Sequence, residues 1–374
     1  MEQKENEVIA FIKKEAVLCA AILLAVLSSF FIKPSVNYIT YLDYRVLVLL
    51  FCLMLVVAGF KNLGIFQLLG EKLCSRVHTT RGLTFVLVNL CFFASMLITN
   101  DVSLITFIPF TLSVYAMAGY EKVLIPVVVL ETIAANLGSM LTPVGNPQNL
   151  LLYSVSGMSM GDFILHMLPL TCVSYVAIVV CIFFIPDQHI ILHGNQSQDT
   201  KKWLNVRFIV YCILFLICLG NVTHLISSYW TVGLIVAVTI FIVNRRLFTQ
   251  VDYSLLMTFV GFFIFIGNMK QIPVINQWLQ GIIKGNELLV GIVSSQIISN
   301  VPAAMLLSGF TTDYKQLLYG VNIGGLGTLI ASMASLISYR FFARTYQEQK
   351  GRYFRVFTIY NVVLLVLLYV VACI

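Results

Sequence analysis

Two short polar motifs interrupt apolar stretches of this chain, and each centres on an asparagine. The first reads ITNDVS (98–103) and the second reads ISNVPA (298–303). Amide, hydroxyl and carbonyl oxygens at membrane depth suit a hard cation such as Na⁺, while the free N–H groups of helix N-termini suit anions. The motifs therefore carry the residue types of an ion site: Thr99, Asn100 and Asp101 in the first, Ser299 and Asn300 in the second.

A longer polar stretch, ANLGSMLTPVGNPQNLLLY (135–153), also lies between apolar runs. Thr142-Pro143 predicts the end of one half-helix, because the proline ring disfavours α geometry in the residue before it. Asn146-Pro147 predicts the start of the next half-helix, with Asn146 as N-cap and Pro147 at the first helical position. Unsatisfied backbone groups are costly in hydrocarbon, so a break of this kind is typical of a transporter's binding site.

Two carboxylates fall within apolar runs. Asp101 is the sharper candidate, because a charge inside the membrane is costly and indicates a function such as proton or cation coupling. Its alternative role is to cap the helix that follows, and Val301 occupies the matching place in the second motif. Glu131 lies about 15 Å before Thr142 at 1.5 Å per residue. We expect it near the membrane boundary, where it would snorkel to the interface.

The candidate site is completed by polar side chains around the interruptions. The predicted substrate-binding residues are Asn100, Thr142, Asn146, Gln148, Asn149, Asn300, Thr328, Ser332 and Ser335. The predicted ion-coupling residues are Thr99, Asn100, Asp101, Gly145, Asn146, Ser299, Asn300 and Ala331, with Na⁺ expected at Asn100, Asn146 and Asn300. Simple helix capping and helix packing by these side chains is the structural alternative. No Lys or Arg falls in these motifs, so an anionic substrate would be held by helix dipoles, amides and co-bound cations.

The composition is that of a membrane protein. Of the 374 residues, 59% are hydrophobic and 10% are charged, and the mean hydropathy is +0.94. These values exclude a soluble globular protein and predict an all-α polytopic protein whose partner is the lipid bilayer. The net charge of +7 forms no basic surface interleaved with aromatic residues, so no nucleic-acid partner is expected. The nine cysteines show no CxxC spacing, which indicates packing rather than metal binding.

The apolar segments predict about nine transmembrane helices and two re-entrant helical hairpins. The helices are expected at 16–33, 42–60, 122–155, 163–185, 206–223, 229–246, 254–269, 316–339 and 354–373. The hairpins are expected at 82–117 and 287–311, because their arms are short for full crossings and meet at the two polar motifs. With a cytoplasmic N-terminus, most of the 23 Lys and Arg residues fall at cytoplasmic ends, as the positive-inside rule requires. We therefore expect a multi-pass protein of the inner (plasma) membrane with its C-terminus outside.

The two halves of the chain resemble each other. Matched pairs include Asp43 with Asp252, Asn100 with Asn300, Asn136 with Asn322, Gly138 with Gly324, and Thr142 with Thr328. A single linking helix would invert the second repeat, which is the design of secondary transporters with sites at the midplane. The predicted units are a first repeat (1–185) with a hairpin (82–117) and a broken helix (122–155), a cytoplasmic loop and linking helix (186–223), and a second repeat (224–374) with a hairpin (287–311) and a broken helix (316–339).

At these motifs the sequence resembles the ion transporter superfamily, which includes arsenite permeases, NhaD-type sodium/proton antiporters, citrate transporters and divalent anion/sodium symporters. TND (99–101) is similar to the first hairpin tip of the arsenite and sodium/proton branches, and 136–151 and 322–337 are similar to the two broken helices. The symporter branch has Ser-Asn-Thr at both tips, whereas Asp101 and Val301 stand at the third positions here. The resemblance implies a scaffold domain, a moving transport domain and, in many members, a homodimer.

We therefore expect a secondary active transporter that moves a small anion, a carboxylate or oxyanion of the citrate or dicarboxylate kind, by an elevator-like movement. Coupling to Na⁺ or H⁺ is expected, with no other cofactor. The first alternatives are a sodium/proton antiporter, which Asp101 favours, and an arsenite-type efflux permease. An enzyme is disfavoured because the sequence has no HExxH, no GxSxG and no His/Asp cluster at membrane depth. A passive channel is the remaining alternative.

Overall fold

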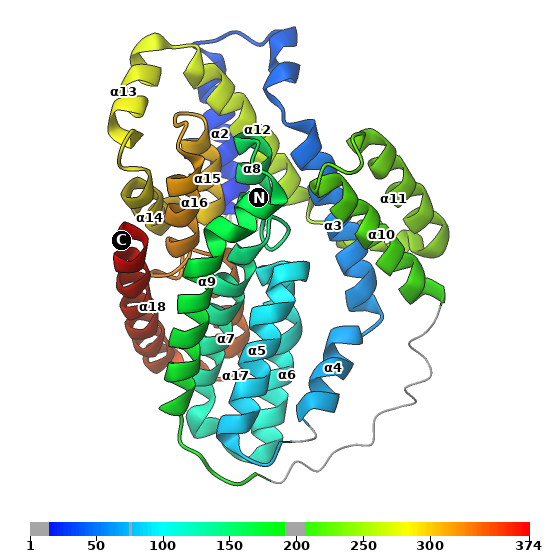
Figure 1. Cartoon of the computed structure of the whole chain (residues 1–374), viewed down its shortest axis with the longest axis vertical. Coiled ribbons are helices and arrows are strands. Elements are labelled where there is room, and N and C mark those ends of the chain that lie inside the picture. Colours follow the sequence, from blue (N-terminus) through cyan, green and yellow to red (C-terminus); the bar gives the residue numbers. More distant parts are fainter. Residues whose placement is uncertain (1–14, 75–76, 191–205) are drawn as a thin grey trace, which may run out of the picture.

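The chain folds into a bundle of helices. The computed structural model describes residues 15–74, 77–190 and 206–374 (Figure 1). The α-helices are α2 (Ala16–Ser29), α3 (Tyr44–Asn62), α4 (Ile65–Cys74), α5 (Thr80–Ile98), α6 (Asn100–Ala118), α7 (Leu124–Gly138), α8 (Pro147–Ser156), α9 (Met160–Phe183), α10 (Val206–Val222), α11 (Tyr229–Asn244), α12 (Tyr253–Lys270), α13 (Pro273–Ile283), α14 (Glu287–Ile298), α15 (Asn300–Ser308), α16 (Tyr314–Ile323), α17 (Met333–Thr345) and α18 (Lys350–Cys373). Short 3₁₀ turns are η1 (Val36–Tyr41), η2 (Glu121–Val123), η3 (Ser139–Leu141), η5 (Arg245–Gln250) and η6 (Gln347–Gln349). The predicted all-α class is confirmed for the described residues, whose one β contact is an isolated bridge between Thr79 and His189.

Many of these helices suit a membrane. Eight helical segments of the described chain are long and apolar enough to cross one, and α2, α10 and α14 are shorter apolar helices. These elements make the protein a multi-pass membrane protein. The segment Glu121–Leu141, which contains α7, is the most enclosed, with 89% of its apolar window buried against 22% for Tyr229–Gln250. A helix that is apolar on all sides, as α7 is, needs such a central position.

The two polar motifs are the tips of two helical hairpins. Thr99 alone separates α5 from α6, with φ 71° and ψ 151°, and Ser299 alone separates α14 from α15, with φ 75° and ψ 154°. A positive φ is strained for a residue with a side chain, and such strain clusters at functional sites. In Figure 1 the α5–α6 hairpin rises from below and the α14–α15 hairpin descends from above. The tips therefore approach one another from opposite ends of the bundle.

The lengths of the hairpin arms differ from expectation in the first half. α5 and α6 have 19 residues each and both are long and apolar enough to span a membrane, so the expectation of short arms is wrong there. α14 and α15, with 12 and 9 residues, agree with it. The polar tip was visible in the sequence, but the length of a helix depends on the neighbours that bury it. The re-entrant course of the hairpins stays a prediction.

Both broken helices are present. The first consists of α7 with η3 and then α8, and the second consists of α16 and then α17. Asn146 is the N-cap of α8, its side-chain oxygen accepts the Asn149 N–H at 3.1 Å, and Pro147 holds the first helical position. These are the roles that the Asn-Pro pair predicted. In the second half Ser332 is the N-cap of α17 and makes no side-chain capping bond.

The helices before each hairpin also match. α3 and α12 begin after Asp43 and Asp252, whose carboxylates accept the N–H groups of Val46 and Leu255 at 3.0 and 2.9 Å. The two caps have nearly equal dihedral angles, φ −81° and ψ 90° against φ −80° and ψ 84°. Sequence matches of this kind therefore correspond to matched local structures.

Packing sorts the helices into two groups. In one group α2 packs against α12, and α3 packs against α10 and α11. In the other, α7 packs against α5, α6, α9, α17 and α18. The second hairpin packs on α16 through both arms and on α8 through α15. In Figure 1, α10 and α11 lie at the upper right, while α9 and α18 lie at the left and extend lower.

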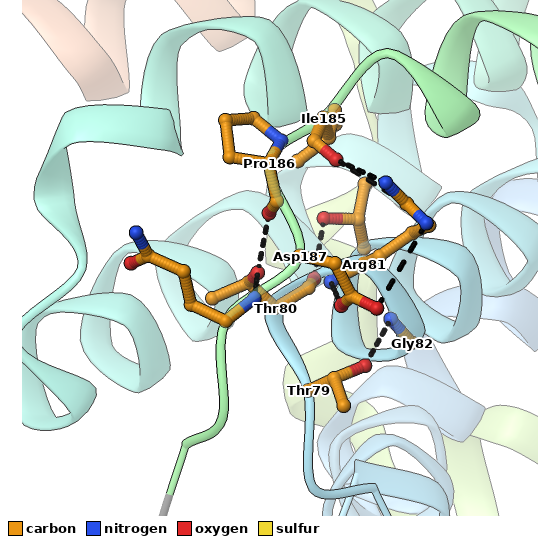
Figure 2. A network of polar contacts seen from close by, with 9 residues as sticks. Thr79, Thr80, Arg81, Gly82, Ile185, Pro186 and Asp187 are labelled. Carbon is orange, nitrogen blue, oxygen red and sulfur yellow. Dashed lines mark hydrogen bonds and ion pairs between the residues drawn. The ribbon is translucent and has the colours of Figure 1, made fainter.

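A strap closes the lower end of the first hairpin. Figure 2 shows the residues after α9 lying against the first turn of α5. The Thr80 hydroxyl donates to the Pro186 carbonyl at 2.6 Å and accepts the Gln188 N–H at 3.0 Å. Arg81 donates to the Ile185 carbonyl at 3.2 Å and lies 3.8 Å from the carboxylate of Asp187. We call residues 185–190 the strap. It ties the lower end of the first hairpin to α9.

Candidate functional site

Each hairpin tip is joined to a broken helix by the same backbone contact. The N–H of Asn100 donates to the Gly145 carbonyl at 3.2 Å, and the N–H of Asn300 donates to the Ala331 carbonyl at 2.9 Å. The side-chain oxygen of each asparagine accepts the N–H of the residue that follows it, at 2.9 Å in both halves. Asn100 and Asn300 are thus the first residues of α6 and α15, and their positions are fixed by the breaks in the neighbouring helices.

The two broken helices are joined to each other by reciprocal side-chain contacts. Nδ2 of Asn136 in α7 donates to the Ser335 hydroxyl of α17 at 3.4 Å. Nδ2 of Asn322 in α16 donates to the side-chain oxygen Oδ1 of Asn149 in α8 at 2.8 Å. Asn136 and Asn322 are matched residues of the repeat, and so are Asn149 and Ser335. The contacts are therefore two copies of one interaction across a pseudo-twofold axis. All four side chains are buried.

Asn136 links three of these elements. Its side-chain oxygen accepts from Asn100 Nδ2 at 3.0 Å and from the Ser332 hydroxyl at 2.9 Å. The first hairpin, the first broken helix and the second broken helix therefore meet at one amide. Asn136 and Asn322 were missing from the predicted site residues. The signal that could have found them was their conservation between the two repeats, together with their polar character inside an apolar run.

The predicted threonines bind the hairpin arms rather than an open site. Thr142 donates from its hydroxyl to the carbonyl of Met96 in α5, and Thr328 donates to the carbonyl of Gln296 in α14 at 3.3 Å. Met96 and Gln296 occupy equivalent places in the two hairpins. Both threonines thus fasten a helix break to the first arm of its own hairpin. In this structure their hydroxyl groups therefore make hydrogen bonds between a broken helix and a hairpin arm.

The amides of the first break are used in a similar way. Asn149 Nδ2 donates to the carbonyls of Ser139, Met140 and Thr142 at 3.3, 3.2 and 3.2 Å, and Asn146 Nδ2 donates to the Ser139 hydroxyl at 3.0 Å. These contacts satisfy backbone groups that the break leaves without helical partners. Asn146 and Asn149 therefore hold the break in shape.

Gln148 and Asp101 are different, because their polar atoms have no partner. Gln148 is 1% exposed, and neither its amide nitrogen nor its amide oxygen makes a hydrogen bond. Oδ1 of Asp101 is also buried and unpartnered. Asp252, at the start of α12, is the charged group within electrostatic range of Asp101. Buried polar atoms are nearly always paired, so orphaned ones mark places where a ligand or water belongs.

Close packing fixes the broken helices against the hairpins. A Cβ on Gly138 would lie 2.1 Å from the Phe92 carbonyl oxygen of α5, and a Cβ on Gly324 would lie 2.7 Å from the Ser295 hydroxyl oxygen of α14. Both distances are shorter than van der Waals contact, so only glycine allows each hairpin arm to approach its helix this closely.

The predicted site residues thus divide into four sets. Thr142, Asn146 and Thr328 form the first set, with hydrogen bonds to the hairpin arms or within the break. Asn100, Gly145, Asn149, Asn300, Ala331, Ser332 and Ser335 come together through the contacts above, either directly or through Asn136 and Asn322. Thr99 and Ser299 supply the strained turns, and the Ser299 hydroxyl lies 3.4 Å from the Ala331 carbonyl. Gln148 and Asp101 have buried polar atoms without a partner among the described residues, and Asn322, which lies in the same network, has one at Oδ1. Within the described ranges, no three His, Cys, Asp or Glu side chains are grouped so that they could hold a metal ion.

Glu131 does not lie at an interface. Its side chain is 0% exposed, and every residue of α7 except Pro126 is buried. The expected snorkelling is therefore wrong. α7 is surrounded by α5, α6, α9, α17 and α18, which the pattern of a single helix does not reveal.

Comparison with known proteins agrees with this architecture. The family model described as "Citrate transporter" matches residues 8–313. The uncharacterized transporter MJ0456 of Methanocaldococcus jannaschii is 34% identical over 305 residues, covering 80% of this chain and 81% of that protein. The inner membrane protein YbiR of Escherichia coli is 32% identical over 307 residues, covering 80% of each. The silicon efflux transporter LSI3 of Oryza sativa is 35% identical over 128 residues, covering 34% of this chain and 26% of that protein. This chain is a membrane transporter and belongs to the citrate transporter family.

Proposed function

We propose that the protein is a secondary active transporter that moves a small anion, a carboxylate or oxyanion, coupled to Na⁺ or H⁺. The observation that carries the proposal is the matched joining of two hairpin tips to two helix breaks, through Asn100 with Gly145 and Asn300 with Ala331. Inverted repeats with discontinuous helices bind substrate and ion where their halves meet. The orphaned amide of Gln148 supports a substrate at that place.

The electrostatics of the meeting point favour an anion accompanied by a cation. α6, α8, α15 and α17 all begin at the tips and breaks, so four helix N-termini with partial positive charge gather there. The tips and breaks contain no Lys or Arg to neutralise a negative substrate. Asp101 and the carbonyls of the breaks supply the oxygen ligands that Na⁺ prefers, with Asn100, Asn146 and Asn300 as its proposed neighbours.

The division of the helices into two packing groups supports an elevator-like movement. The groups are joined by α4, which packs on α3 and on both arms of the first hairpin, and by the contacts of α3 with α8 and of α12 with α15. The offset of α9 and α18 from α10 and α11 in Figure 1 fits sliding of the hairpin-bearing group along the other. We propose a cytoplasmic N-terminus, an outside C-terminus and an inner-membrane location. The Escherichia coli relative is named an inner membrane protein, which supports that location.

Two alternatives each have a specific observation behind them. The orphaned oxygen of Asp101 favours sodium/proton antiport without an anion. The similarity to a protein named a silicon efflux transporter favours export of a small oxyacid, as in arsenite-type permeases, although the matched part is 34% of this chain.

The test is a flux panel with purified protein in proteoliposomes. Citrate, shorter dicarboxylates, arsenite and silicic acid are offered in turn under an imposed Na⁺ gradient, an imposed pH gradient, or neither. We expect one carboxylate or oxyanion to move faster under one gradient. We expect Gln148→Ala to raise the half-saturation concentration of that substrate. Ser174→Ala is the control, because Ser174 is buried in α9 and its hydroxyl donates within its own helix, to the Leu170 carbonyl at 2.7 Å. Gradient-driven cation exchange that is independent of every anion would overturn the proposal in favour of antiport.

A further inference from the structure

A buried carboxyl group lies outside the proposed site in the same helix. Glu131 of α7 is 0% exposed, and its Oε1 accepts the hydroxyl of Thr111 of α6 at 2.6 Å. Its Oε2 is buried and has no partner. Asn136, which joins the two broken helices, lies five residues further along α7, about 7.5 Å at 1.5 Å per residue.

The surroundings of Glu131 contain acids but no cation. The titratable groups within electrostatic range are Cys91 of α5, Tyr115 of α6, Cys74 of α4 and Tyr353 of α18. All of these are neutral in their protonated forms and are 3% exposed or less. The other main neighbours of α7 are α9 and α17, and among the residues that the structure describes none forms an ion pair with Glu131.

This environment suits a carboxylic acid and not a carboxylate. A charge buried without a counter-charge is costly enough that the group takes its neutral form instead. One oxygen of Glu131 accepts the Thr111 hydroxyl, the Cys91 thiol lies beside the carboxyl group as a weak donor, and the second oxygen is left to carry the proton. Within the described ranges Glu131 belongs to no group of three His, Cys, Asp or Glu side chains that could hold a metal ion, which leaves the proton as its ligand.

A row of hydroxyl groups leads from the strap toward Glu131. The Thr80 hydroxyl bonds to the strap at Pro186 and Gln188, which are both exposed. Deeper in the bundle, the hydroxyls of Thr84 and Tyr115 lie 2.7 Å apart, and Tyr115 donates to the Thr80 carbonyl at 3.1 Å. Tyr115 is one helical turn from Thr111 on the same face of α6, since residues four apart are neighbours on a helix.

We propose that Glu131 is a proton-binding site of the hairpin-bearing group, loaded from the strap end through Thr84 and Tyr115. A proton from water at the strap end adds to the carboxylate, and the same O–H bond breaks when the proton leaves. The inference that Glu131 binds a proton rests on its burial and its contacts and does not depend on the proposed function. Its role in coupling rests on the proposed function, with the proton as coupling ion and α7 as the link to Asn136.

The second hairpin provides a matched control. Glu287 is also buried, at 5% exposed, and its Oε1 accepts the hydroxyl of Thr311 at 2.9 Å. Thr311 is equivalent to Thr111 in the repeat. Glu287 is, however, the first residue of α14, where the free N–H groups of a helix N-terminus stabilise a carboxylate. The two glutamates therefore share a threonine partner and differ in what surrounds the charge.

The first measurement needs no transport. Infrared difference spectra of the purified wild-type protein between acid and alkaline pH report the C=O stretch of protonated carboxylic acids. We expect such a band at neutral pH that shifts in D₂O, is absent in Glu131→Gln and is kept in Glu287→Gln. Tyr115→Phe should slow the deuterium shift by ~10-fold or more while leaving the band in place. A wild-type spectrum without a protonated-acid band at neutral pH would overturn the proton site, whether or not the variants fold.

The second measurement tests coupling in proteoliposomes. We expect Glu131→Gln to lose stimulation of substrate flux by a pH gradient, while Glu287→Gln keeps it. Unchanged stimulation in Glu131→Gln would overturn the coupling role, even with the infrared band assigned. If the wild type moves no anion but shows the band, the proposed function fails and the proton site stands, so the two failures are distinguishable.

Discussion

Asn136 is the amide through which three elements meet, and its removal should weaken the whole site. Asn136→Ala deletes the contacts to Asn100, Ser332 and Ser335. In membrane proteins such side-chain bonds average about 0.6 kcal/mol each, which sets a lower bound near 2 kcal/mol. Counted instead from the partners, two buried donors, Asn100 Nδ2 and the Ser332 hydroxyl, would lose their acceptor at about 1–2 kcal/mol each, in the lower part of the range for such groups. We expect a total of about 2–4 kcal/mol.

The assay separates binding from folding. At 1.4 kcal/mol per tenfold, a loss that falls wholly on substrate binding raises the half-saturation concentration roughly 30- to 700-fold. Flux against substrate concentration gives that value, and the melting temperature in detergent gives the part that falls on folding. The control is Ser174→Ala, which loses one bond inside α9 and should change flux less than ~2-fold. If Asn136→Ala resembled Ser174→Ala in both measurements, the contacts of Asn136 would contribute no measurable free energy and the reasoning would be refuted.

Three further changes test single features of the site. Gly138→Ala puts a Cβ 2.1 Å from the Phe92 carbonyl, so little folded protein should be recovered, whereas Gly161→Ala meets nothing closer than 3.8 Å and should fold normally; equal recovery on size-exclusion chromatography would contradict this. Gln148→Leu breaks no hydrogen bond within the described residues, so its melting temperature should stay within ~2 °C while substrate affinity falls ~10-fold or more; unchanged affinity would show that the amide serves no ligand. Asp101→Asn should abolish dependence of flux on the coupling gradient while leaving the fold intact, and gradient dependence equal to the wild type would remove Asp101 from coupling.

Local chemistry was readable from the sequence because it depends on neighbours in the chain. The start of α8 follows from Asn146 and Pro147, whose roles as cap and first helical residue need only the next turn. The tips at Thr99 and Ser299 were located because polar residues interrupt an otherwise apolar run. The internal match of the halves predicted a tip and a break in each half, and both are present.

Contacts between distant segments were not readable in the same way. Asn136 and Ser332 are 196 residues apart, and nothing local to either residue specifies the other. Glu131 was misjudged for a related reason, since an apolar helix has no polar face to show which side meets lipid and which meets protein. The long arms of the first hairpin were missed because the burial that stabilises α5 and α6 is supplied by α7 and α17.

The two helix breaks show that the duplicated halves reached the same structural result by exchanging the location of an amide. In the first half, Asn149 on the broken helix donates to the Met140 carbonyl, and the matched carbonyl of Leu326 is served instead by Gln296 on the hairpin. In the first half the amide, Asn149, lies on the broken helix and the matched hairpin residue is Met96. In the second half the amide, Gln296, lies on the hairpin and the matched residue of the broken helix is Ser335. Gln296→Met alone should lower the melting temperature, and Ser335→Asn alone should raise it little. Made together they should restore part of the melting temperature, because the new amide can reach the carbonyl that the lost one had served.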